Sequence, residues 1–128
     1  MKVTESELEI LQVLWQKGAS TVRDVNDLLN LKREIGYTTT LKMMQLMFEK
    51  KMLTRDDAQR THIYAANITE ADTQQNLVDK LLDSAFGGSA MKLVMQALGH
   101  HKTSKEELDE IKSLIQKIEN QNSHDKNS

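Results

Sequence analysis

Polar side chains with the chemistry to contact nucleic acid recur on one side of a helix predicted near residues 38–50. At about 100° per residue, Thr38, Lys42, Gln45 and Glu49 lie together, opposite a side rich in methionine. Lysine can donate to guanine acceptors and glutamine can pair with adenine, so Lys42 and Gln45 suit base contacts. Thr38 and Thr39 suit a phosphate at the start of the helix, and the alternative for them is an ordinary helix cap.

Basic residues gather around a hairpin that is predicted directly after that helix. Residues 32–60 carry seven basic and four acidic side chains, whereas the whole chain has a net charge of −2. Arg55 and Arg60 flank the predicted loop, and Arg60 is the better candidate for a phosphate or minor-groove contact. Lys50 and Lys51 are alternatively cations that bind free carbonyl groups at the helix end, a role that suits Lys50 better. A local basic excess of this size is also common on ordinary solvated surfaces.

Residue types that support catalysis or tight metal binding are sparse. The chain has no cysteine, which excludes disulfides, thiolate metal sites and cysteine nucleophiles. It contains no nucleophile at a readable spacing from a histidine and a base, no glycine-rich phosphate loop and no HExxH motif. His100 and His101, with the distant His124, could hold a metal, but adjacent histidines on a loop are more often simply solvated. We therefore expect a protein that is not an enzyme and binds no cofactor.

The composition predicts one small, mostly helical protein. Its 128 residues include no proline and five glycines, which leaves long stretches free to form helices. Aromatic residues make up 4%, so Trp15 and the methionines Met43, Met44 and Met47 are predicted to be core residues rather than the lining of a ligand pocket. The charged N-terminus and the lack of an apolar run of about 18 residues argue against a signal peptide or membrane insertion, so a cytoplasmic protein is expected.

Capping residues mark two helices in the first half of the chain. Thr4 and Glu7 are spaced as a capping box that begins a helix over residues 5–17, which Gly18 ends. Thr21 begins a short second helix, and the third helix is followed by strands over residues 52–55 and 61–65. This order is typical of a winged helix-turn-helix domain, which we predict over residues 1–68. The alternatives are a structural α+β domain and a winged-helix adaptor that binds proteins and not DNA.

Three further helices are predicted between residues 69 and 120, each with one apolar stripe. They are too thin to enclose a core alone, so they must fold back onto the first half or pack against a second copy. We favour the homodimer. The expected fold class is mainly α with a small β-hairpin, a winged helix-turn-helix domain plus a C-terminal helical dimerisation region, with residues 121–128 as a flexible tail. The predicted dimerisation residues are Leu77, Leu81, Val94, Leu98, Leu108, Ile111 and Ile115.

Several segments resemble the BlaI/MecI/CopY transcriptional repressors, a family of the penicillinase-repressor type. Residues 37–41 (Tyr-Thr-Thr-Thr-Leu), 48–55 (Phe-Glu-Lys-Lys-Met-Leu-Thr-Arg) and 60–64 (Arg-Thr-His-Ile-Tyr) are similar to that family's recognition helix and wing. Residues 7–15 resemble its opening helix, and residues 86–89 and 104–108 resemble its C-terminal dimerisation region. The resemblance spans residues 4–118 and implies a homodimeric repressor that binds a palindromic operator in double-stranded DNA.

The same resemblance implies a route of release. In the family, a membrane sensor with a protease domain commonly leads to cleavage of the repressor in its C-terminal region. Gln96 and Ala97 stand where the penicillinase branch has its Asn-Phe bond, so they mark the candidate cleavage region. The copper-responsive branch uses a cysteine cluster, which this chain lacks. Two further departures are Leu46, where the family often has a basic residue, and Lys51, where it usually has glycine.

Overall fold

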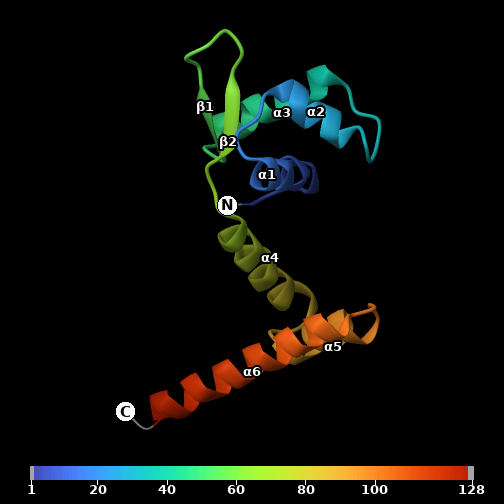
Figure 1. Cartoon of the computed structure of the whole chain (residues 1–128), viewed down its shortest axis with the longest axis vertical. Coiled ribbons are helices and arrows are strands. Elements are labelled where there is room, and N and C mark those ends of the chain that lie inside the picture. Colours follow the sequence, from blue (N-terminus) through green and yellow to red (C-terminus); the bar gives the residue numbers. More distant parts are fainter. Residues whose placement is uncertain (1, 127–128) are drawn as a thin grey trace. The chain divides into compact units, whose positions relative to one another are not determined.

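The computed structural model describes residues 2–126, which form six α-helices and one two-stranded antiparallel sheet (Figure 1). The mainly helical fold with one hairpin that the sequence predicts is confirmed. The chain divides into two compact units, Met1–Val78 and Asp79–Ser128, so the division falls within the fourth helix, later than the predicted boundary at residue 68. The elements are α1 (Glu5–Lys17), α2 (Val22–Leu29), α3 (Tyr37–Glu49), β1 (Leu53–Asp56), β2 (Ile63–Ala66), α4 (Glu70–Ala85), α5 (Ala90–Gly99) and α6 (Lys105–Lys126).

Local capping decides where α1 and α2 begin. The Thr4 hydroxyl accepts a hydrogen bond from the Glu7 N–H at 3.1 Å, and the Glu7 carboxylate accepts one from the Thr4 N–H at 3.0 Å. The predicted capping box is therefore present. α1 ends at Gly18, whose φ of 83° favours glycine. The Thr21 hydroxyl begins α2 by accepting from the Asp24 N–H at 3.1 Å, and this helix has 8 residues.

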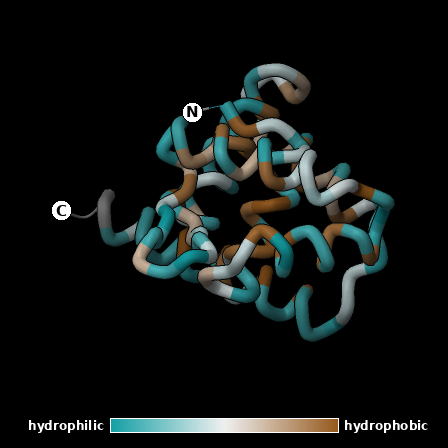
Figure 2. Tube along the Cα trace, turned by 90° about the horizontal axis from the view of Figure 1, so that it is seen from above, coloured by the Kyte–Doolittle hydropathy of each residue, from teal (hydrophilic) through white to brown (hydrophobic). Residues whose placement is uncertain are grey.

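The core of the first unit lies between α1, α2, α3 and the sheet. Figure 2 shows hydrophobic residues alternating with hydrophilic ones along the trace, the pattern expected of helices with one buried side. Met44 and Met47 are fully buried and Met43 packs against them, so the methionines are core residues as predicted. Trp15 also packs on this core, and its Nε1–H donates to the Ile68 carbonyl at 3.0 Å. The buried apolar side chains are Ile10, Leu11, Leu14, Val22, Val25, Leu29, Ile35, Met44, Met47, Met52, Leu53 and Tyr64.

A single residue in the left-handed conformation joins α3 to the sheet. Lys51 has a φ of 67°, and it is the only residue other than glycine with a positive φ in the described range 2–126. Its N–H donates to the Phe48 carbonyl at 3.0 Å, and its carbonyl accepts from the Asn67 side chain at 2.8 Å. A residue with a side chain is strained in this conformation, whereas glycine is not. This difference explains why the resembled family usually has glycine at this position.

The two strands form a hairpin whose register is set by four residue pairs. Leu53 lies opposite Ala66, and Arg55 lies opposite Tyr64. Ser20, in the turn before α2, forms a further bridge with Tyr64 through backbone hydrogen bonds of 2.9 and 2.8 Å. The hairpin is thereby attached to the start of α2. Both strands begin one or two residues later than the sequence predicts, with the hairpin loop between residues 56 and 63.

The second unit consists of the end of α4 followed by α5 and α6. α4 ends before Gly87 and Gly88, which have φ values of 55° and 80°, and the Ser89 hydroxyl caps α5 by accepting from the Lys92 N–H at 3.2 Å. None of the side chains of residues 79–124 is fully buried. Within residues 2–126, no helix is both long and apolar enough to cross a lipid bilayer.

α6 is longer than the sequence analysis allows. The helix runs to Lys126, so residues 121–126 of the predicted flexible tail are helical, and residues 127 and 128 lie outside the described range. No glycine or proline interrupts residues 105–126, and the Gln116 side chain donates to that of Asn120 at 3.1 Å along the exposed surface. Polar composition alone therefore does not end this helix.

Candidate nucleic-acid interface

α3 presents the predicted contact residues to solvent. Thr38, Thr39, Lys42 and Gln45 are all exposed, while the opposite side of the helix carries the buried Met44 and Met47. The side chains that suit base and phosphate contacts therefore share one accessible surface, as the helical spacing predicts.

The first turn of α3 has free backbone donors. Its N-cap is Gly36, which offers no side-chain hydrogen bond, whereas α1 and α2 are each capped by a threonine hydroxyl. The alternative role of Thr38 as an ordinary N-cap is excluded, because the helix begins earlier and Thr38 lies inside its first turn. Uncapped N–H groups together with the hydroxyls of Thr38 and Thr39 can donate to an anion at this end of the helix.

A buried amide network fixes the direction of α3. Asn26 on α2 donates from its Nδ2 to the Thr40 hydroxyl at 2.8 Å and to the Ile35 carbonyl at 3.1 Å. Asn30 donates to the same carbonyl at 2.9 Å, and its Oδ1 accepts from the Ile35 N–H at 3.2 Å. Sequence reasoning missed this network. The available signal was an asparagine on the apolar side of α2, between Val25 and Leu29.

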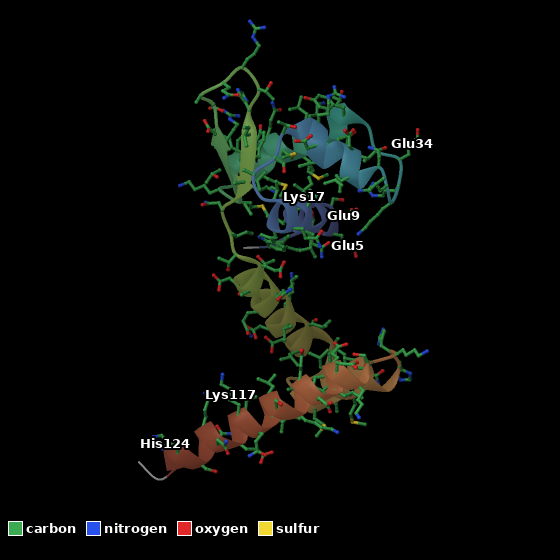
Figure 3. All side chains as sticks on the ribbon, in the orientation of Figure 1. Glu5, Glu9, Lys17, Glu34, Lys117 and His124 are labelled. Carbon is green, nitrogen blue, oxygen red and sulfur yellow. The ribbon has the colours of Figure 1, made fainter. Side chains whose placement is uncertain are left out.

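An ion pair attaches the turn between α2 and α3 to α1. Arg33 Nη2 lies 3.0 Å from Glu9 Oε1, and its Nε is 3.4 Å from the other carboxylate oxygen. Figure 3 shows Glu9 on α1 and Glu34 on the turn that leads into α3. Arg33 is thus engaged within the protein and is a weak candidate for a DNA contact.

The two arginines of the hairpin have different environments. Arg55 forms a two-point ion pair with Asp57, at 2.7 and 3.2 Å, and lies over the Phe48 ring at 4.3 Å from its centroid. The hydrogen bond with Asp57 raises the pKa of Arg55 further above its usual value. Arg60 is exposed and forms no ion pair with any described residue. This difference favours Arg60, the residue preferred from the sequence.

Lys50 has a partner other than the one expected. Its Nζ lies 3.0 Å from Glu7 Oε2, so it pairs with α1 and not with the free carbonyls at the end of α3. Burial alone would raise the pKa of Glu7, but hydrogen bonds from the Thr4 N–H and from Lys50 outweigh it, and the pKa is lowered. Lys50 is therefore a structural cation that attaches α3 to α1.

A groove brings the starts of α2 and α3 next to the hairpin. Arg23 at the start of α2 lies over the Tyr37 ring, 5.1 Å from its centroid, and His62 Nε2 is 3.7 Å from Asp57 Oδ1. Sequence reasoning missed Arg23, Tyr37 and His62. Arg23 could have been found from its position in the first turn of α2. The helix dipole disfavours a cation there unless an anion binds nearby, so an arginine at this position indicates an anion site. The groove is lined by Thr21, Val22, Arg23, Asp24, Tyr37, Leu41, Arg60, Thr61, His62 and Tyr64.

The predicted dimerisation residues carry exposed apolar surface. Val94 is 46% exposed and Ile115 51%, while Leu98 and Ile111 are half-buried. Further apolar side chains that sequence reasoning left out of this set are also exposed. The exposed large apolar residues of α4, α5 and α6 are Leu77, Val78, Leu81, Met91, Val94, Met95, Leu108, Leu114, Ile115 and Ile118.

The remaining sequence candidates lie near the end of α5. Gln96 and Ala97 are exposed and helical, and His101 Nδ1 lies 3.1 Å from the Ala97 carbonyl oxygen. In the range 2–126, no three histidine or acidic side chains are grouped closely enough to hold a metal ion. His100 and His101 are both solvent-exposed.

Known proteins resemble this chain along nearly its whole length. A family profile described as penicillinase repressor matches residues 3–117. The penicillinase repressor of Bacillus licheniformis is 22% identical over 119 residues, which cover 93% of this chain and 93% of that protein. The methicillin resistance regulatory protein MecI of Staphylococcus aureus (strain N315) is 15% identical over 116 residues, 91% of this chain and 94% of that protein.

One solved structure and one further relative extend the comparison. The transcriptional regulator BlaI of Mycobacterium tuberculosis (strain CDC 1551 / Oshkosh) is 22% identical over 120 residues, 92% of this chain and 86% of that protein. The solution structure of the DNA-binding domain of the repressor BlaI aligns with a TM-score of 0.50 and 24% identity, covering 56% of this chain and 87% of that domain. This likeness shows the winged-helix fold.

Proposed function

Because this chain belongs to the penicillinase repressor family and is a DNA-binding transcriptional repressor, we propose that two copies of it together bind one palindromic operator. The observation that carries the operator contact in this proposal is the accessible side of α3, which has an uncapped first turn and exposed Lys42 and Gln45. Family membership favours DNA binding over the adaptor that binds only proteins. The family consists of repressors, not of enzymes.

Within this proposal, α3 enters the major groove and the hairpin contacts the backbone. Lys42 and Gln45 read base edges, because they are exposed and long enough to reach guanine and adenine acceptors. Thr38, Thr39 and Arg60 bind phosphates, since the first turn of α3 has free donors and Arg60 has no ion-pair partner in the described structure. Arg23 and His62 add positive or donor groups along the same groove.

Selection of duplexes from a random library, followed by anisotropy titration of the selected duplex over a salt series, tests the function. We expect the logarithm of affinity to fall with the logarithm of salt concentration, with a slope of about −0.9 for each phosphate neutralised. The selected duplex should bind more tightly than its scrambled version at physiological salt. Equal affinity for both duplexes would contradict operator recognition.

The homodimer is supported by the apolar surface of α4, α5 and α6. Side chains such as Val94 and Ile115 are about half exposed, and a second copy would remove them from water. Exposed apolar side chains in this number are otherwise an aggregation hazard. Sedimentation at micromolar concentration should show a dimer, and a wild-type monomer would contradict the proposal.

Release of the operator by a cut in the C-terminal region completes the proposed function, with a membrane sensor-protease as the proposed partner. The supporting feature is the exposed Gln96–Ala97 segment near the end of α5, a helix of 10 residues whose last turn can open at little cost. Replacing this segment with the recognition sequence of a specific protease allows a cut on demand. The cut should lower operator affinity, whereas retained affinity after complete cutting would exclude this route.

A further inference from the structure

One apolar side chain interrupts the polar, accessible surface of α3. Leu46 is 55% exposed, although the exposed residues one turn before and one turn after it, Lys42 and Glu49, are charged. A scattered exposed leucine is ordinary on a protein surface. This one is different because it lies on the helix that the proposed function places in the major groove, where the exposed side chains meet base edges.

The helix geometry assigns Leu46 to the same side as Lys42. Residues four apart lie about 40° from each other around a helix, so the two side chains stand on neighbouring turns. The opposite side of α3 is held in the core by three fully buried residues, Thr40, Met44 and Met47. The core and its amide network are complete without Leu46, whose side chain remains in water in the free protein.

We propose that Leu46 contacts the 5-methyl group of a thymine, so that it determines sequence specificity at one position of each operator half-site. This inference rests on the proposed function. Thymine is the only base with a methyl group on its major-groove edge. Leucine offers no hydrogen-bonding atom, so at any other base it can neither pair with the polar edge nor find a methyl group to pack against.

Spacing along α3 places this thymine close to the base pair that Lys42 contacts. Side chains four residues apart on a helix are separated by about 5–6 Å at their Cβ atoms. Successive base pairs rise about 3.4 Å along the duplex. The thymine should therefore lie one or two base pairs from the position that loses its preference when Lys42 is replaced.

Removing single methyl groups from the DNA tests the contact. The probe is the duplex selected by the wild-type protein from a random library, with each thymine replaced in turn by deoxyuridine. Losing one buried methyl group should weaken wild-type binding about three- to fivefold at one thymine per half-site. Leu46→Ala removes the contact from both half-sites, so it should weaken binding to the unmodified duplex by about the square of that factor, roughly 9- to 25-fold. It should show no further loss with deoxyuridine at that position.

Matched variants separate this contact from general effects of a lost leucine. Leu31→Ala makes the same change at a leucine that is 81% exposed in the turn after α2, and it should keep the wild-type response to deoxyuridine. Leu46→Met should also keep the response, because it preserves an apolar side chain of similar reach. Leu46→Lys should lose the response and make the salt slope of the dimer steeper by about 1.8, because each of the two protomers adds one phosphate contact.

The outcomes distinguish this inference from the function on which it rests. If selection yields no preferred duplex, the proposed function and the Leu46 contact both fail. If a duplex is selected but deoxyuridine is tolerated at every position, only the Leu46 contact fails. A deoxyuridine effect that is equal in the wild type and in Leu46→Ala shows that another residue contacts the methyl group. A weaker dimer in Leu46→Ala, without any effect of deoxyuridine, shows that Leu46 packs against protein.

Discussion

The two units of this chain bury their apolar residues to very different extents. The first unit encloses a core of twelve buried apolar side chains between α1, α2, α3 and the hairpin. In the second unit, none of the side chains of residues 79–124 is fully buried, although its helices carry regular apolar stripes. The comparison teaches that an amphipathic pattern predicts which side of a helix avoids water, but not what covers that side.

The largest expected effect follows from blocking the exposed stripe of the second unit. Replacing Ile111 and Ile115 together by aspartate places two charges on that stripe, so we expect monomers in sedimentation and operator affinity lowered by about 100-fold or more, as loss of linked binding predicts. Ser113→Asp with Gln116→Asp adds the same charges to exposed polar positions of α6 and should remain dimeric. A dimer that survives the isoleucine changes would show that this stripe does not hold two copies together.

A matched pair of methionines tests the difference in burial between the two units. Met47 is fully buried in the first unit, whereas Met95 is 62% exposed in the second. Met47→Ala should lower the free energy of unfolding of the first unit by about 2–5 kcal/mol, because it leaves a cavity in the core. Met95→Ala should change it by less than about 0.5 kcal/mol. Denaturant titration monitored by circular dichroism measures both, and equal losses would contradict the contrast in burial.

The DNA surface of the first unit allows a finer test. Gln45→Ala should weaken binding to the selected duplex by about 1–3 kcal/mol and leave scrambled DNA nearly unaffected, because it removes a base contact. Arg60→Ala should weaken both duplexes by a similar factor and reduce the salt slope of the dimer by about 1.8, because each protomer loses one phosphate contact. Anisotropy titrations over a salt series measure these effects. If Gln45→Ala weakens both duplexes equally, the assigned roles are wrong.

The contact between α1 and α3 gives the first unit a pH dependence. The pKa of Glu7 is lowered below its ordinary value of 4.5, since the Thr4 N–H and Lys50 stabilise the carboxylate more than burial destabilises it. The ionised Glu7 side chain therefore contributes fully to the free energy of unfolding above pH 4.5. This contribution is lost as pH falls through the lowered pKa. Glu7→Gln should cost about 1–2 kcal/mol at neutral pH.

That cost should disappear in acid, where the wild-type side chain is also neutral. Thermal unfolding of both proteins from neutral pH down to acid pH measures the difference. Lys50→Met is the partner control, because it removes the ion pair but leaves the capping box of Thr4 and Glu7 in place. A difference between wild type and Glu7→Gln that stays constant with pH would show that the charge of Glu7 does not stabilise the fold.

The smallest expected effect concerns backbone strain after α3. Lys51→Gly should raise the free energy of unfolding by about 0.5–1 kcal/mol, because relief of the left-handed strain exceeds the added freedom of the unfolded chain. Lys51→Ala keeps the strain and should give no such gain. Denaturant titration measures both variants. A loss of stability in the glycine variant would show that the lysine side chain outweighs the strain at a φ of 67°.

Local features were predictable from the sequence, and long-range contacts were not. The spacing of Thr4 and Glu7 specifies a cap within one turn, so α1 was predicted with its observed bounds. The roles of Asn26 and Lys50 depend on partners 14 and 43 residues away, which periodicity does not identify. The positions of the methionines predict which side of α3 is exposed. The first residue of the helix was not predicted, because its N-cap, Gly36, has no side chain that marks the start.

The single tryptophan gives the protein an optical probe of its own. Trp15 packs on the core of the first unit and donates its indole N–H to the Ile68 carbonyl, just before α4 begins. Indole emission moves to longer wavelength when the ring enters water. The fluorescence of the unlabelled protein therefore reports whether the chain leading into α4 stays attached to the first unit, and it can be followed on the same samples as the DNA titrations.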